Sequence, residues 1–355
     1  MGLWRRAERM CDGESAVPVA RPCTTPALTT LRSWRHGGFR SKTARGRLAS
    51  SFGVDATLKL VVEHCCIMNL LQQIYDDADM AEDLTILIGS FGQLEHLRPC
   101  LESIFDTVTG GTSFRVIVGF NFPGESDSPR AIACDFPRAE QLRAPVKLGY
   151  CRAYNQMMAR STGRYVLVLD DDTVLRPGTI DGMVRFMDAH PEVGIAGCRT
   201  VGPDGSYQKT TALMYTMGTE LLNVLRSSAV WRDGIDEAVT SWKSAGWLNG
   251  HFLLVRAQVI RETGGLDEHF YTFQSEADWC LRIRRAGWEV AYVPDFEIIH
   301  IWGRHSNVKS YWAHIRAHVN RYYFIRKHYG NVAFHVFRLI MSLGAMLRLL
   351  KFLVV

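Results

Sequence analysis

The sequence predicts an α/β fold built on a mostly parallel sheet with helices on both faces. Three observations predict it. From residue 84 onward, apolar segments of strand length alternate with segments of helical periodicity, which is typical of parallel strands joined by crossover helices. The strand-like segments are nearly unbroken runs of apolar residues, as buried strands are. The chain has 355 residues, 47% of them hydrophobic, which is enough for one large domain or two modest ones.

The first part of this pattern runs from residue 84 to residue 198. In chain order, we expect a strand at 84–89, a helix at 94–104, a strand at 114–120, a helix at 151–163, a strand at 164–170, a helix at 177–191 and a strand at 193–198. Pro99 is tolerated if it lies in the first turn of the first helix.

The second part starts near residue 245. Here we expect strands at 251–256, 288–294 and 297–302, with helices at 257–265 and 275–287. Paired glycines end the first of these helices, and Gly287 caps the second.

The N-terminal segment differs from the rest in charge. Residues 1–50 hold ten Lys or Arg against three Asp or Glu, whereas the net charge of the whole chain is +5. The remainder is therefore close to neutral and gives no indication of a nucleic-acid partner. We interpret residues 1–79 as a disordered basic extension, with one appended helix near 58–75 and Met80 as a natural start. A membrane- or RNA-touching arm and an organelle-targeting leader are the alternatives.

The nine cysteines indicate a reducing compartment. Their number is odd, no C-x-x-C is present, and the only close pair is Cys65-Cys66, so neither a disulfide framework nor a zinc site is indicated. Arg5, Arg6 and Arg9 break the first apolar stretch, which argues against a secretory signal. We therefore expect a cytoplasmic location.

The C-terminal residues 331–355 are apolar but carry Arg338, Arg348 and Lys351. The longest uncharged stretch before the terminal four residues is Leu339–Leu347, shorter than the ~20 residues needed to span a bilayer. We expect an amphipathic helix that lies in the plane of a membrane over 332–355, peripheral at its inner face. Packing against the domain is the alternative.

Three consecutive acids, Asp170, Asp171 and Asp172, end the strand expected at 164–170. In open parallel sheets ligands bind beyond the carboxyl ends of the strands. Carboxylates suit Mg²⁺ or Mn²⁺, which share their ligand shell with substrate phosphates, and a dication would also remove the repulsion between the acids. A solvated turn with acidic caps is the alternative.

A phosphatase of the haloacid dehalogenase type also fits part of this stretch. Asp170, Asp172 and Val174 match its D-x-D-x-[TV] pattern. That family, however, places its nucleophile on the first strand and needs a later acidic pair. At least two expected strands precede the acids here, so the sequence favours another enzyme class.

Three segments, at 147–178, 190–208 and 264–306, together carry a more specific pattern. In order and spacing they resemble the family 2 inverting glycosyltransferases with the glycosyltransferase A fold, particularly the rhamnosyltransferase-like branch. The resemblance implies a domain over 80–330. Its nucleotide-sugar-binding half is 84–200 and its acceptor and catalytic half is 201–330.

The resemblance also implies roles for the acids. Asp172 would ligate the metal directly, Asp170 would help through water or the ribose, and His300 would be a further metal ligand. Glu276 stands where the family has its catalytic base, although Ser275 replaces the first acid of the usual pattern. Asp278 completes the catalytic pair, more as an orienting group than as a base. A helix start with stabilising acids is the alternative.

The donor side is implied by a second set of residues. These are Ser90, Phe91, Asn121, Gly149, Arg152, Asn155, Asp170 and Asp171. Phe120, just before Asn121, stands where the family usually has an aspartate that reads the nucleobase. An aromatic ring can stack on a base but cannot accept its imide hydrogen bond. The nucleobase of the donor is therefore left open.

The acceptor side would begin just before the strand expected at 251–256. Trp247, Gly250 and His251 lie there, and Trp247 would either stack on a sugar ring or belong to the core. Arg304 and Ser306 could meet phosphate oxygens.

From these residues we expect a metal-dependent inverting glycosyltransferase, hexosyl- or rhamnosyltransferase-like, with Mn²⁺ or Mg²⁺ as cofactor. It would move a sugar from a nucleoside-diphosphate sugar to a hydroxyl of a glycan or lipid-linked saccharide in polysaccharide assembly. A non-catalytic protein that binds nucleotide sugars or glycans is the rival, suggested by Phe120 and Ser275.

Overall fold

The computed structural model describes residues 82–354, except 109, 122–126, 226–238 and 302–310. All of these residues belong to one compact unit, Leu60–Val355. The extension expected at 1–79, its helix at 58–75, and the loop residues Arg304 and Ser306 lie outside the described residues.

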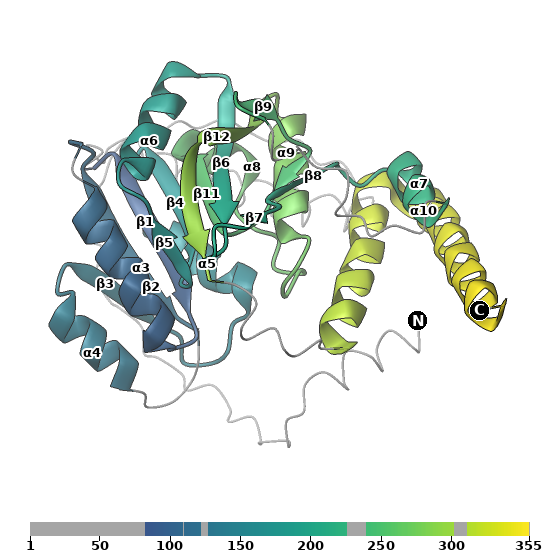
Figure 1. The fold of residues 1–355 in the computed structure, drawn as a ribbon, viewed down its shortest axis with the longest axis horizontal. Coiled ribbons are helices and arrows are strands. Elements are labelled where there is room, and N and C mark those ends of the chain that lie inside the picture. Colours follow the sequence, from purple (N-terminus) through teal and green to yellow (C-terminus); the bar gives the residue numbers. More distant parts are fainter. Residues whose placement is uncertain (1–81, 109, 122–126, 226–238, 302–310, 355) are drawn as a thin grey trace, which may run out of the picture. The chain divides into compact units, whose positions relative to one another are not determined.

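The centre of this unit is a mixed sheet (Figure 1). Its strands in the described residues are β1 (Leu84–Ser90), β2 (Phe114–Phe120), β3 (Ala139–Arg143), β4 (Tyr165–Asp170), β5 (Thr173–Leu175), β6 (Val193–Val201), β7 (Tyr207–Gln208), β9 (Lys243–Ser244), β11 (Phe252–Arg256) and β12 (Glu289–His300). The order is β3-β2-β1-β4-β11-β6-β12-β5, with β7 beside β6 and β9 beside β12. Two short strands, β8 (Thr211–Ala212) and β10 (Trp247–Leu248), form a second sheet.

The long strands are mostly parallel, as the sequence predicts. β3, β2, β1 and β4 run parallel to one another, and β6 runs parallel to β12. Between these groups lies β11, antiparallel to both β4 and β6. The expected strands at 288–294 and 297–302 are one strand, β12, whose register against β6 shifts between Val293 and Glu297.

Helices cover both faces of the sheet (Figure 1). They are α3 (Leu94–Thr107), α4 (Asp127–Asp135), α5 (Tyr150–Met158), α6 (Thr179–Ala189), α7 (Met217–Leu225), α8 (Ala257–Thr263), α9 (Ser275–Arg285) and α10 (Tyr311–Val354). Pro99 lies inside α3 beyond its first turn, contrary to the expectation. The helix expected at 151–163 ends earlier, at Met158.

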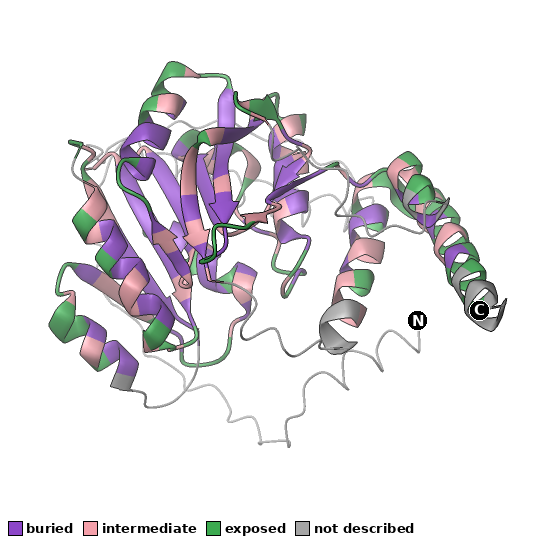
Figure 2. Ribbon diagram, viewed as in Figure 1, coloured by how far each residue is buried: buried purple, intermediate pink, exposed green. Residues whose placement is uncertain are grey.

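Alternation along the strands explains the two faces. In β1, Ile86 and Ile88 belong to one buried cluster with residues of α3 and α6, whereas Leu87 belongs to a second cluster with residues of α5 and α9. Successive strand residues point to opposite faces, so one apolar run supplies both cores. The resulting buried centre is visible in Figure 2.

The C-terminal helix α10 has two segments. They meet at Gly330, whose φ of 84° lies in the left-handed region, where glycine carries no steric penalty. The break falls beside the boundary expected before residue 331. The stretch Ile315–Leu347 is long and apolar enough to cross a membrane by length and composition, and an 18-residue window within it has a mean hydropathy of 1.4. The uncharged runs within this stretch are shorter than a membrane span, because Arg316, Arg321, Arg326, Lys327 and Arg338 interrupt them.

Candidate active site

The three acids are fixed where several strand ends converge. Asp170 pairs with Gly89 near the carboxyl end of β1, and its N–H donates to the carbonyl of His251, just before β11 (3.4 Å). On the other side, the N–H of Ile301 donates to the carbonyl of Asp172 (3.0 Å). The backbone therefore holds the acid loop between the start of β11 and the end of β12.

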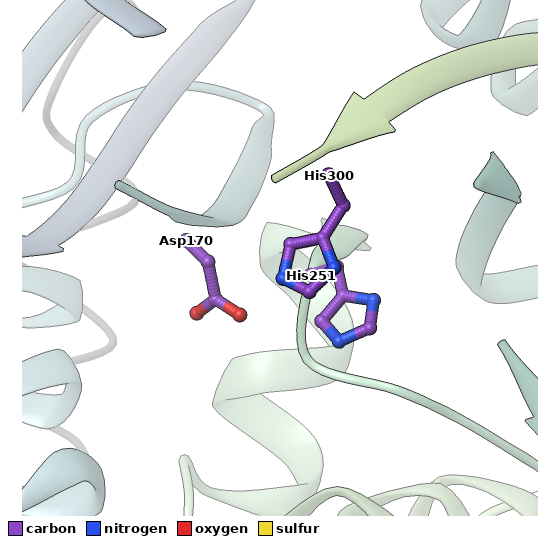
Figure 3. Close-up of side chains that lie close together, drawn as sticks. All are labelled: Asp170, His251 and His300. Atoms are coloured by element: carbon purple, nitrogen blue, oxygen red, sulfur yellow. The ribbon is translucent and has the colours of Figure 1, made fainter. Parts of the chain in front are cut away.

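Two histidines meet the acids at this point. Asp170, His251 and His300 each offer a ligand atom, and these atoms lie within 4.8 Å of one another (Figure 3). The two imidazole rings are stacked, with centroids 3.8 Å apart. Nε2 of His300 lies 3.3 Å from Oδ1 of Asp172. The structure thus brings together the three expected metal residues and adds His251, which is expected on the acceptor side.

Gln208 orients His300. Its Oε1 lies 2.7 Å from Nδ1 of the ring, and its Nε2 donates to the His300 carbonyl (3.0 Å). These two contacts leave the opposite ring nitrogen facing Asp172. Partners of this kind fix the orientation of histidines that bind metals.

The pKa shifts differ among the three acids. Burial, followed by the charges of the two neighbouring acids, raises the pKa of Asp170 well above its ordinary value. Burial raises the pKa of Asp171 to about 6, although the Ser90 hydroxyl opposes this. Burial also acts to raise the pKa of Asp172, but the hydrogen bond and charge of His300 outweigh it, and the net shift is downward.

The cluster fits a divalent cation. Oδ2 of Asp171 and Nδ1 of His251 are buried without a hydrogen-bond partner among the described residues. Burial, and then the neighbouring His300, lower the pKa of His251 to about 3, so its ring is neutral at physiological pH, the form that binds metals. Carboxylate oxygens with imidazole nitrogens form a donor set that Mn²⁺ or Mg²⁺ can use.

Glu276 reaches the same region from α9. A Cβ atom added to Gly250 would lie 3.0 Å from Oε1 of Glu276 and 2.7 Å from the Tyr150 hydroxyl. Burial raises the pKa of Glu276, and its charge contributes to the raised pKa of Asp170. Gly250 therefore leaves room for the carboxylate beside the acid cluster, as the expected acceptor-side role requires.

Asp278, in contrast, is held in a structural network. Its Oδ2 accepts from Arg282 (2.8 Å), and its Oδ1 lies 2.5 Å from Nζ of Lys327 and 2.7 Å from Nε2 of His328. Its side chain is fully buried. Asp278 therefore anchors α9 to α10, and its part in catalysis stays a prediction.

Several expected donor residues shape the loops around the cluster. The Ser90 hydroxyl accepts from the N–H of Gly92 (3.0 Å), and Phe91 is exposed. Oδ1 of Asn121 accepts from the N–H of Leu148 (2.7 Å), which ties the end of β2 to the loop before α5. Gly149, with a φ of 80°, allows that loop to pass the ring of Tyr271.

Arg152 and Asn155 bind groups of the loop between α8 and α9. Arg152 pairs with Glu268 (2.9 Å), and Asn155 donates to the Leu266 carbonyl (2.8 Å). Both contacts link α5 to the loop before α9. Their expected contacts with the donor stay predictions.

Two aromatic residues belong to the core. Phe120 is 2% exposed and packs in the first buried cluster, so it is not available to stack on a nucleobase. Trp247 is 3% exposed, and its indole N–H donates to the Leu213 carbonyl (3.1 Å). The sugar-stacking role considered for Trp247 is therefore wrong, and its core role is confirmed.

Sequence reasoning missed Tyr150 and Gln208. The Tyr150 hydroxyl is buried without a hydrogen-bond partner among the described residues and lies close to Gly250. Tyr150 follows Gly149 directly, so its position next to an expected donor residue was the available signal. Gln208 ends the family-like segment 190–208, but only the pairing of β7 with β6 shows that it reaches His300.

Two family models match the sequence. The family described as "Glycosyl transferase family 2" matches residues 85–243, and "Glycosyl transferase family group 2" matches residues 165–355, more than half of the chain. The chain belongs to the family 2 glycosyltransferases. Membership of this family shows that the protein is an enzyme and excludes the alternative of a non-catalytic binding protein.

This glycosyltransferase is similar to a curated relative. The N-acetylglucosaminyl-diphospho-decaprenol L-rhamnosyltransferase of Mycobacterium tuberculosis is 28% identical over 238 residues, 62% of this chain and 77% of the relative. The rhamnosyltransferase-like resemblance is thereby confirmed.

Solved structures also match the glycosyltransferase. The mannosyltransferase PcManGT from Pyrobaculum calidifontis, in complex with GDP-Man and Mn²⁺, aligns with a TM-score of 0.49 and 13% identity, covering 79% of this chain and 82% of that one. GalNAc-T7 with UDP, GalNAc and Mn²⁺ aligns with a TM-score of 0.49 and 11% identity, over 63% of this chain and 45% of that one. The present chain thus spans less than half the length of GalNAc-T7.

Proposed function

We propose that this glycosyltransferase moves a sugar from a nucleoside-diphosphate sugar to an acceptor hydroxyl, with inversion at the anomeric carbon. The observation that carries the proposal is the convergence of the 170–172 acids, His251 and His300 at one edge of the sheet, with Glu276 beside them. We further propose a lipid-linked saccharide as acceptor, because the curated relative is named for a diphospho-decaprenol substrate.

Asp172, His300, Asp170 and His251 would hold a divalent cation. When bound, such a cation would supply positive charge for the oxygens of the leaving diphosphate. The protein contributes ligands that strand ends already position and Gln208, which fixes the ring of His300. Mn²⁺ and Mg²⁺ both fit these ligands.

Glu276 would act as the general base. Its carboxylate would accept the proton of the acceptor hydroxyl as that oxygen forms a bond to the anomeric carbon, while the anomeric C–O bond breaks and the nucleoside diphosphate leaves with the electron pair. One displacement on the face opposite the leaving group inverts the configuration. Burial raises the pKa of Glu276, which makes the carboxylate a stronger base while Gly250 keeps space open beside it.

Glu276→Gln tests this assignment. The amide keeps the size of the side chain but cannot accept the proton, so we expect kcat to fall by about 100-fold or more with little change in nucleotide affinity. Product formation and the affinity for nucleoside diphosphate with Mn²⁺ are measured together. Turnover at the wild-type rate would show that another group is the base.

We also propose that α10 docks on the surface of a membrane, at its cytoplasmic face. An exposed apolar face runs along its second segment at intervals of four and three residues: Val332, Val336, Leu339, Leu343 and Met346. Residues 331–355 contain no Asp or Glu but include Arg338, Arg348 and Lys351, a charge that suits anionic lipids.

The opposite side of the same segment packs on the protein. Phe337 is fully buried in the second core cluster, and its ring lies 4.9 Å from that of Tyr322. A helix with one side against the domain and the other exposed is suited to an in-plane position. Such docking would bring the active site to an acceptor embedded in the bilayer.

Vesicle binding tests this surface. We expect the full chain to co-sediment with phosphatidylglycerol vesicles. Leu339→Asn with Leu343→Asn should weaken partitioning at least about tenfold, because two exposed leucines that would enter the bilayer are removed. Ser342→Asn on the same segment is the matched control. Equal partitioning of the double variant and the wild type would refute docking through this face.

A further inference from the structure

The turn that precedes Glu276 has an unusual backbone. We call residues 271–274 the base turn, because α9 and its Glu276 follow directly. Phe273 and Gln274 have φ values of 63° and 61°, and they are the only non-glycine residues with positive φ in the described part of the chain. Such values are disfavoured for residues with a Cβ, so they persist only where surrounding contacts enforce them.

Asn320 of α10 supplies such contacts. Its side-chain amide donates to the carbonyl of Thr272 and, at 3.0 Å, to the carbonyl of Phe273. Asn320 is 7% exposed, so neither carbonyl could easily exchange this partner for water. One NH₂ group thus satisfies two successive carbonyls at the start of the strained backbone.

Two further contacts hold the other end of the base turn. The guanidinium of Arg316, one turn before Asn320 on α10, lies 4.5 Å from the ring centre of Tyr271. The Tyr271 carbonyl accepts from the N–H of Tyr150 (3.2 Å). The base turn therefore lies between the first segment of α10 and the loop that begins α5.

We propose that Asn320 is a positioning residue for Glu276, acting through the base turn. Gln274 flanks the start of α9, and Glu276 is the second residue of that helix. A relaxed turn would let the first turn of α9 shift and move the carboxylate away from Gly250. This inference rests on the proposed role of Glu276 as base. It assigns a part in catalysis to a helix that contributes none of the reacting groups.

Two substitutions remove the donor in different ways. Asn320→Ala deletes the amide, whereas Asn320→Asp keeps the size of the side chain and its packing but places an acceptor opposite two carbonyls. Tyr329→Phe is the matched control, because the Tyr329 hydroxyl is another α10 anchor, donating to the Tyr215 carbonyl (2.7 Å) without touching the base turn.

We expect both Asn320 variants to lower kcat by about ten- to a hundred-fold, since small displacements of catalytic groups have effects of that size. KM for the donor should stay within about threefold of the wild-type value, because the acid cluster is untouched. In Asn320→Ala, the acidic limb of the kcat profile should also move to lower pH, as Glu276 gains contact with water. Tyr329→Phe should change neither kcat nor that limb.

The outcomes distinguish the positioning role of Asn320 from the role of Glu276 as general base. Wild-type kcat in Asn320→Asp, or an equal loss of kcat in Tyr329→Phe, would overturn the role of Asn320. Glu276→Gln is assayed in parallel: if it keeps turnover, the proposed base itself is wrong. If Glu276→Gln is inactive while both Asn320 variants are normal, only the positioning role fails.

Discussion

At the scale of single residues, polar contacts rather than burial separate the groups that serve the site from those that serve the core, since His300 is 1% exposed and Trp247 is 3% exposed. The acids at 170–172 and His300 could be predicted because they follow strand ends, where ligands bind in such sheets. His251 and Trp247 both precede β11, yet one joins the acid cluster and the other the core. That division depends on how β10 pairs with β8, which no local pattern reveals.

Trp247→Phe tests the core assignment. It removes the indole N–H and leaves the Leu213 carbonyl without its donor, so we expect stability to fall by about 1–3 kcal/mol. The donor and acceptor KM values should stay unchanged, because the ring is buried. Urea denaturation and steady-state kinetics measure the two effects. A large rise in acceptor KM with unchanged stability would restore the sugar-stacking role.

At the scale of elements, periodicity predicted most long strands and helices but not the direction of β11 or the joining of two segments into β12. Both depend on pairing between distant parts of the chain. The contacts of α10 could not be predicted from the sequence either. Lys327 bridges Asp267 (2.7 Å) and Asp278 (2.5 Å), and His328 adds a second contact to Asp278. These ion pairs join the first segment of α10 to α9 and to the loop before it.

The ion pairs predict how stability depends on pH. Burial acts to raise the pKa of Asp278, but His328, Arg282 and Lys327 outweigh it and lower the value. Burial also acts to raise the pKa of Asp267, but the hydrogen bond from Lys327 and smaller contributions outweigh it and lower the value. Both carboxylates therefore bind protons less readily when folded. Their stabilisation is present above the unfolded value of 3.8 and is lost as pH falls through the folded values.

Lys327→Met tests this linkage. We expect it to lower stability by about 2 kcal/mol at pH 7, since charged hydrogen bonds are lost. The further loss between pH 5 and pH 3 should be smaller than in the wild type, because the carboxylate pKa values move back toward ordinary ones. Thermal melts across this range give both quantities. Parallel curves for the two proteins would show that these ion pairs do not govern acid stability.

At the scale of the whole molecule, the mixed sheet brings together residues from four distant segments. Ser90 ends β1, the acids end β4, His251 precedes β11 and His300 ends β12. The fold class and the family could be predicted because order and spacing of motifs are properties of the sequence. The base turn and its contact with Asn320 could not, because left-handed backbone at Phe273 and Gln274 leaves no compositional mark.

The most direct test is to locate manganese in crystals grown with Mn²⁺ and a nucleoside diphosphate. Anomalous scattering identifies the ion independently of activity. We expect one peak within coordination distance of Asp172 and His300, with diphosphate oxygens completing its shell. An ordered nucleotide with no manganese at these residues, or with the ion bound elsewhere, would contradict the proposal that the converging strand ends form a metal-dependent transfer site.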